Sequence, residues 1–316
     1  MPMIAIGATA GAAFGAKITA FLVEPEGLAS LFVAWGLEPL AEFARQTLRT
    51  ESLLLLACIP LGASILLTRI VDRRRGGGTD PAARPESDSA GGLSLVLGNR
   101  FLLGVAVVTL ILNWVNTNGE NLLYRVVQET LTQRAEAAGI VGAKAVQDFT
   151  FARTTGFYGD FYTWVNVVAL LLQAVIASRL LKYGGFATIL LMLPVVALTS
   201  YATMALVPVL AVLKVMKVAE NATDYSINNT ARNVLWLPVH SAVKLKGKPT
   251  IDSLFARVGD GFAALTVLVG VQFLALATEV FFVFNVGLVV IWLFLSFGII
   301  RGHRALVEEA ARETGA

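Results

Sequence analysis

A stripe of polar residues lies inside an apolar stretch, 207–228, that is long enough to cross a membrane. Its members recur at steps of three or four and therefore share one helical face: Lys214, Lys217, Asn221, Asp224 and Asn228. Charges at membrane depth cost about 2.5–3.5 kcal/mol each, so they are seldom idle. Since lysine is a common partner of phosphate, we expect Lys214 and Lys217 to contact an anionic solute in a water-filled cavity. Asn221 and Asp224 would bind its hydroxyl groups or close a gate.

The same stripe has a structural alternative. Glu220 lies near this face and could pair with Lys217. An internal lattice of salt bridges would then hold neighbouring helices together, and for Glu220 and Asp224 both alternatives stay open. Two nearby lysines repel each other unless an anion is present, which favours the binding role for the lysines.

A second polar group, "NWVNTNGENLLYR", covers residues 113–125. Asn113, Asn116 and Glu120 share one helical face, and we expect them to line the facing wall of the cavity. A gate role is the alternative, because this group lies toward the external end of its helix. Asn118, Asn121 and Arg125 fall on the neighbouring face. Tyr124 is expected to be an anchor at the membrane interface. Lys17, alone among glycines and alanines of another apolar stretch, is a further candidate for solute binding.

The composition places these groups in an integral membrane protein. The chain has 316 residues, of which 56% are hydrophobic and 15% charged, with a mean hydropathy of +0.71. Spans of about 20 apolar residues predict an all-α polytopic protein with eight transmembrane helices near 3–23, 52–71, 101–119, 157–178, 185–206, 207–228, 254–275 and 280–300. Segment 28–46 is expected to be an extension or an interfacial helix, with a span as the alternative.

Loop charges predict the orientation and the division of the chain. Most Lys and Arg residues fall on one side if 72–99, a Gly-, Pro- and Ser-rich linker, is cytoplasmic. Both ends are then cytoplasmic as well. The predicted parts are 1–71, the remainder of an N-terminal transmembrane half; the linker 72–99; a six-helix half, 100–304; and a tail, 305–316.

The sequence offers little for an enzyme. It has one cysteine and two histidines that are far apart, so a metal site is not expected, and no hydrolase or nucleotide-hydrolysis motif occurs. A net charge of +3 gives no indication of nucleic-acid binding. We expect no cofactor, and as partners only the lipid bilayer and a small anionic molecule.

Residues 220–261 resemble the ATP/ADP antiporter family, the nucleotide translocators of plastids and intracellular bacteria. The segments "YSINNTARNVLWLPV", "KLKGKPTID" and "RVGD" follow the family pattern without a gap. The matching positions are Tyr225, Ser226, Pro238, Lys244, Lys246, Gly247, Lys248, Asp252, Arg257 and Gly259. Asn229 and Asp260 differ, because the family has Asp and Lys there.

The resemblance implies a major-facilitator-like bundle of twelve helices, of which the first four would be absent from this chain. It also implies nucleotide exchange by alternating access in a bacterial inner membrane. The residues expected at the cytoplasmic gate or loop are Asn228, Asn229, Arg232, Lys246, Lys248, Asp252, Arg257 and Asp260. The alternatives are a proton-coupled transporter of another solute, with Glu120, Glu220 or Asp224 titrating, and a non-transporting protein derived from the family.

Overall fold

The computed structural model describes residues 27–47 and 89–313, together with Gly11, Gly15, Lys17, Gly62, 65–67, 69 and 70. In this part of the chain every regular element is a helix. The elements are α2 (Gly27–Ala34), α3 (Glu38–Thr47), α5 (Ser89–Gly98), α6 (Arg100–Ala137), α7 (Ala143–Leu171), α8 (Ser178–Leu206), α9 (Leu210–Thr223), α10 (Asn229–Leu235), α11 (Ser241–Thr250), α12 (Ala256–Leu268) and α13 (Thr278–Glu313). Four π-helical segments join them: η2 (Leu172–Ala177), η3 (Asp224–Asn228), η4 (Ile251–Phe255) and η5 (Val269–Phe273).

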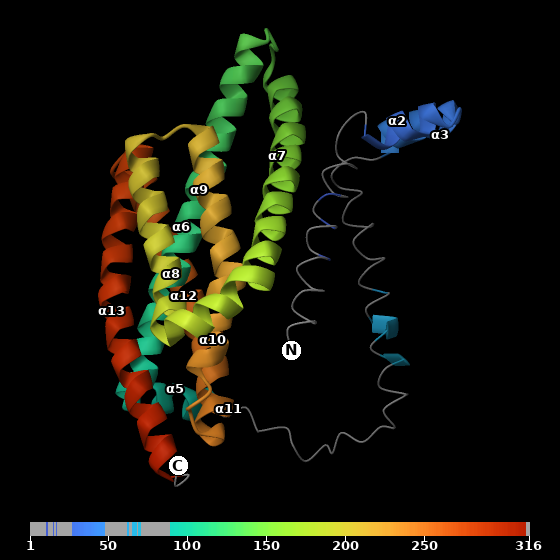
Figure 1. Cartoon of the computed structure of the whole chain (residues 1–316). Helices are drawn as coiled ribbons and strands as arrows, with labels where there is room; N and C mark the ends of the chain where they lie inside the picture. The colour runs from blue at the N-terminus through green and yellow to red at the C-terminus, as the bar shows by residue number, and fades with distance from the viewer. Residues whose placement is uncertain are drawn as a thin grey trace. The chain divides into compact units, whose positions relative to one another are not determined.

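The described residues fall into two compact units. The larger unit contains 89–130 and 164–313, and it holds the candidate site. In it α8 packs against α13 and α9, and α5 packs against α11. Figure 1 shows α6, α8, α9, α12 and α13 side by side as a bundle, with α5 and α11 near the end where the chain terminates. The smaller unit contains 27–47 and 131–163.

Four helical runs among the described residues are long and apolar enough to cross a membrane: 100–137, 143–206, 241–273 and 278–312. By length and composition the chain is therefore a multi-pass membrane protein. The predicted count of eight spans is not confirmed. The predicted spans 3–23 and 52–71 lie outside the described residues, apart from the isolated positions named above.

The run 143–206 contains two of the predicted spans. Its 64 residues would extend about 96 Å at about 1.5 Å per residue, roughly three times the hydrocarbon thickness of a bilayer. The helix is interrupted at Gly185, whose φ of 69° is readily adopted only by glycine. This residue lies where the predicted spans 157–178 and 185–206 meet.

The predicted span 207–228 differs from the observed helix at both ends. Val207 to Val209 are not helical, and α9, η3 and α10 together run from Leu210 to Leu235. This run is not among the four apolar ones, because its charged residues lower its hydropathy. The helix ends three positions before Pro238, in agreement with the expectation that proline stops it there.

Two shorter predictions have clear outcomes. Segment 28–46 forms α2 and α3, which are separated by a turn at Gly36 with φ of 71°. Helices of 8 and 10 residues are too short to span a bilayer. The end of the predicted linker 72–99 forms the helix α5, so this part of the linker is ordered because it packs against α11.

Candidate functional site

The centre of the candidate site is Lys217 on α9, whose side chain is 1% exposed. Its Nζ lies 3.0 Å from Glu220 Oε2 and 3.5 Å from Glu120 Oε1. It also donates a hydrogen bond of 3.3 Å to Asn116 Oδ1. The predicted pairing of Lys217 with Glu220 is confirmed. The contacts with α6 show that this lysine joins two helices.

Tyr201 of α8 completes the cluster from a third helix. Its side chain is fully buried. Its hydroxyl lies 3.0 Å from Glu220 Oε1 and 3.1 Å from the Val115 carbonyl oxygen of α6, and it can donate to either acceptor. Nothing in the sequence singled out this tyrosine, because a tyrosine in an apolar stretch is common at membrane interfaces.

Asn221 connects the same two helices one turn further along α9. Its Nδ2 donates to Glu120 Oε1 at 2.8 Å, and the residue is buried. We call Asn116, Glu120, Tyr201, Lys217, Glu220 and Asn221 the central cluster. All its members lie in the larger unit, and four of them belong to the predicted solute-binding set.

The central cluster already supplies Lys217 with counter-charges, so no bound anion is needed to compensate this lysine. One lysine faces two carboxylates, so the fully ionised cluster carries one net negative charge. Glu120 is the more accessible carboxylate, with a side chain 27% exposed against 5% for Glu220. Lys214, which lies half-buried on the same helix, belongs to none of these bonds.

A close helix approach makes the cluster possible. At Gly119 of α6 an added Cβ would overlap the Tyr201 hydroxyl and lie 3.0 Å from Lys217 Nζ. Glycine therefore lets the side chains of α8 and α9 reach the α6 backbone. A glycine within the polar segment 113–125 was the available signal for this approach.

The remaining polar residues of α6 point to other neighbours. Asn113 donates to the Thr109 carbonyl oxygen of its own helix at 2.7 Å. Asn113 also lies against α12, because a Cβ added to Gly259 of that helix would lie 3.0 Å from the Cβ of Asn113. The structure thus separates Asn113 from Asn116 and Glu120.

Buried Asn118, by contrast, donates to Asn285 Oδ1 of α13 at 2.7 Å. This bond was not anticipated, because the two residues are separated by 167 positions.

The residues expected at the gate form ion pairs and hydrogen bonds that do not involve the central cluster. Arg232 of α10 pairs with Asp252 of η4 at 2.6 Å. Asp260 of α12 pairs with Arg257 at 3.1 Å and accepts a hydrogen bond of 2.7 Å from Thr117 of α6. The carboxylate of Asp260 is therefore compensated by its neighbours.

The other predicted site residues take no part in the central cluster. Asp224 accepts a hydrogen bond of 2.6 Å from Asn228 within η3. Asn229 and Lys246 are exposed, whereas Lys248 is half-buried. Lys17 is helical and exposed, and it belongs to the smaller unit. Its proposed role in solute binding stays a prediction.

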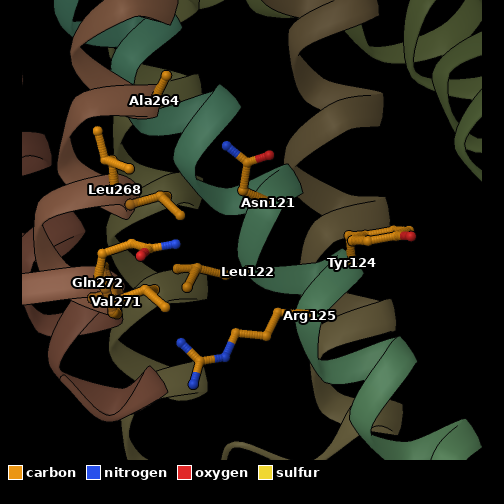
Figure 2. Close-up of a pocket in the computed structure, with 10 residues that line it drawn as sticks. Asn121, Leu122, Tyr124, Arg125, Ala264, Leu268, Val271 and Gln272 are labelled. Atoms are coloured by element: carbon orange, nitrogen blue, oxygen red, sulfur yellow. The ribbon is translucent and has the colours of Figure 1, made fainter. Parts of the chain in front are cut away.

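A cavity of about 500 Å³ has no residue of the central cluster in its lining, and Figure 2 shows its lining side chains. Its lining residues come from α6, α12, η5 and α13: Asn121, Leu122, Tyr124, Arg125, Ala264, Val267, Leu268, Val271, Gln272 and Phe281. Its volume falls in the range of about 300–1,000 Å³ that is typical of small-molecule sites. Its walls are mainly apolar.

Comparison with known proteins gives one relationship. The chain is similar to ADP,ATP carrier protein 1 of Chlamydia pneumoniae, with 23% identity over 34% of this chain and 25% of the carrier. The matched region thus spans about a quarter of the carrier's length. No protein-family model and no solved structure matches the chain.

Proposed function

We propose that this chain belongs to a membrane transporter that moves an anionic, phosphorylated solute of the nucleotide type by alternating access. The observation that carries the proposal is Lys217, a lysine fully buried among three helices and held by carboxylates from two of them. Ionisable residues inside a helical membrane bundle usually mark a solute or ion pathway. The similarity to an ADP,ATP carrier supports a nucleotide as the solute.

The central cluster suggests how an anion would engage it. Glu120 is the more distant and more exposed of the two carboxylates near Lys217. An incoming phosphate would therefore displace Glu120 and leave the Lys217–Glu220 pair within α9. This replacement exchanges a contact between α6 and α9 for a contact with solute. The solute can shift the protein toward the conformation with the altered helix packing only by the amount that it binds this conformation more tightly than the original one.

A second candidate follows from the charge of the same cluster. Two carboxylates share one lysine, and a proton on Glu120 would neutralise the excess negative charge. Protonation would also weaken the contacts of Glu120 with Lys217 and Asn221. Such a cluster could couple a proton to the movement of α6 against α9 in a carrier of another solute.

Proteoliposomes containing the full chain distinguish the two candidates. Uptake of labelled ATP or ADP is measured with and without nucleotide inside, and again under an imposed pH gradient. The variant Lys217→Met keeps the apolar length of the side chain and removes its charge. Lys182→Met, at an exposed position of α8, is the matched control.

Each outcome has a defined meaning. Uptake that needs internal nucleotide, that Lys217→Met abolishes and that Lys182→Met retains supports nucleotide exchange. Uptake that follows the pH gradient without internal nucleotide, and that Glu120→Gln abolishes, supports the proton-coupled candidate. If the well-folded chain takes up nucleotide under neither condition, nucleotide transport is refuted, and a carrier of another solute or a non-transporting membrane protein becomes the better hypothesis.

A further inference from the structure

The cavity between α6 and α12 has the chemistry of an amphiphile site. Apolar side chains form most of its wall, including Leu122 of α6 and Leu268 of α12. The polar residues Asn121, Arg125 and Gln272 also line it. Figure 2 shows the side chains of Leu122, Arg125 and Gln272 extending into the space between these helices.

Arg125 has unused capacity to bind an anion. Its Nε lies 2.8 Å from Glu129 Oε1 on the exposed side of α6. Its Nη1 is buried and has no hydrogen-bond partner within the part of the chain that the structure describes. A buried guanidinium nitrogen without an acceptor costs free energy, and a phosphate oxygen would satisfy it with good geometry.

The length of α6 would allow Arg125 to reach the level of lipid headgroups if Arg100 lies in the opposite headgroup layer. It follows Arg100 by 25 positions in one helix, which is about 38 Å at about 1.5 Å per residue. The hydrocarbon core of a bilayer is about 30 Å thick, so two arginines at this separation reach opposite headgroup layers. Gln272 lies just before residues 274–277, where the chain is not helical. Non-helical backbone exposed to lipid does not occur within the hydrocarbon region.

The apolar wall continues onto the outer surface of α12. Leu268 is 50% exposed and Val271 is 39% exposed, although both line the cavity. In the apolar stretch of 18 residues within the helical run 241–273, only 17% is buried, against 50% in the corresponding stretch of the run 100–137. An acyl chain of a lipid in the surrounding bilayer could therefore enter the cavity from the side, without passing through water.

We propose that this cavity is a binding site for an anionic phospholipid of the bilayer. The phosphate would accept hydrogen bonds from Arg125 and the Gln272 amide, and one acyl chain would lie along Leu122, Leu268 and Val271. The site is separate from the central cluster, and the proposal holds for any transported solute.

The test uses the purified full chain in detergent, with native mass spectrometry to count bound lipids during titration. The probes are dioleoyl-phosphatidylglycerol, dioleoyl-phosphatidylcholine and free oleate. Both lipids carry the phosphate, but the choline cation of phosphatidylcholine would be repelled by Arg125, whereas phosphatidylglycerol keeps a net negative charge. We therefore expect phosphatidylglycerol to bind at least about tenfold more tightly than phosphatidylcholine, a difference of about 1.4 kcal/mol. Arg125→Ala removes this preference.

Two further variants separate the site from general charge effects. Arg301→Ala removes an exposed arginine of α13, at about 30 Å along the helix from the cavity residue Phe281, and should keep the preference. Val267→Trp fills the cavity and should abolish tight binding of phosphatidylglycerol while Arg125 is still present. Arg125→Lys retains the charge and should keep part of the preference, which guards against misfolding of the alanine variant.

Three results would overturn the proposal. The first is equal binding of the two phospholipids to the wild-type protein. The second is an unchanged preference in Arg125→Ala. The third is tight binding of oleate without binding of phosphatidylglycerol, since the occupant would then be a soluble fatty acid.

Discussion

Removal of the buried lysine should reveal how the central cluster is held together. In Lys217→Met the carboxylate of Glu220, 5% exposed, would keep the Tyr201 hydroxyl as its one hydrogen-bond partner among the residues that the structure describes. Breaking a buried ion pair from one side costs about 3–5 kcal/mol, because the remaining charge stays buried without compensation. At about 2–4 °C per kcal/mol, the apparent melting temperature should fall by roughly 6–20 °C.

The double variant Lys217→Met/Glu220→Gln tests the physical reason. It contains no uncompensated buried charge at this position, and the glutamine oxygen can still accept the Tyr201 hydrogen bond. Glu120 is 27% exposed and can be solvated. We therefore expect the double variant to recover at least about 2 kcal/mol relative to Lys217→Met, which is a coupling typical of residues in contact.

Thermal unfolding in detergent, followed by intrinsic fluorescence, measures both variants against the wild-type protein. Lys182→Met, at an exposed site, should unfold within about 2 °C of wild type. The reasoning is refuted if Lys217→Met is as stable as wild type. It is also refuted if the double variant is no more stable than the single one.

Three more predictions concern the packing around the site. Gly119→Ala should destabilise the protein by about 1–3 kcal/mol through overpacking against the hydroxyl of α8; Gly298→Ala, which meets no atom within 4 Å, should be neutral or stabilising in the same thermal assay. Asn118→Ala should cost about 1–3 kcal/mol in that assay, because its buried amide partner on α13 loses a donor, and an unchanged melting temperature would contradict this. Arg232→Gln should lower the free energy of unfolding by less than about 1 kcal/mol, since the ion pair with Asp252 is partly exposed. A transport rate reduced more than about tenfold in this stable variant would support a place for Arg232 at a gate, and an unchanged rate would contradict it.

Local spacing was sufficient to predict some of these contacts. Lys217 and Glu220 are three positions apart, so the helix alone brings them together. The end of the helix before Pro238 follows from the geometry of proline in the same way. The membrane-protein class follows from composition, because so apolar a chain cannot bury its surface in one soluble core.

Contacts between helices could not be predicted from spacing. Glu120 and Lys217 lie on separate helices, and only the packing of α6 against α9 brings them within 3.5 Å. The helical period correctly grouped Asn113, Asn116 and Glu120 on one side of α6, but it did not show that this side contacts two different helices. Asn113 turns toward α12, whereas Asn116 and Glu120 turn toward α9, because two neighbours share what appears in sequence as one face.

The sequence by itself therefore determined that the chain is helical, that it spans a membrane and that polar residues gather within its apolar segments. These properties depend on residue type and on periods of three or four. Tertiary structure decided which charges compensate one another, since burial of Lys217 requires carboxylates from two helices and a glycine at the point where they meet. It also produced the cavity at Arg125, because a cavity is the space that packed helices leave unfilled, and no local pattern specifies that space.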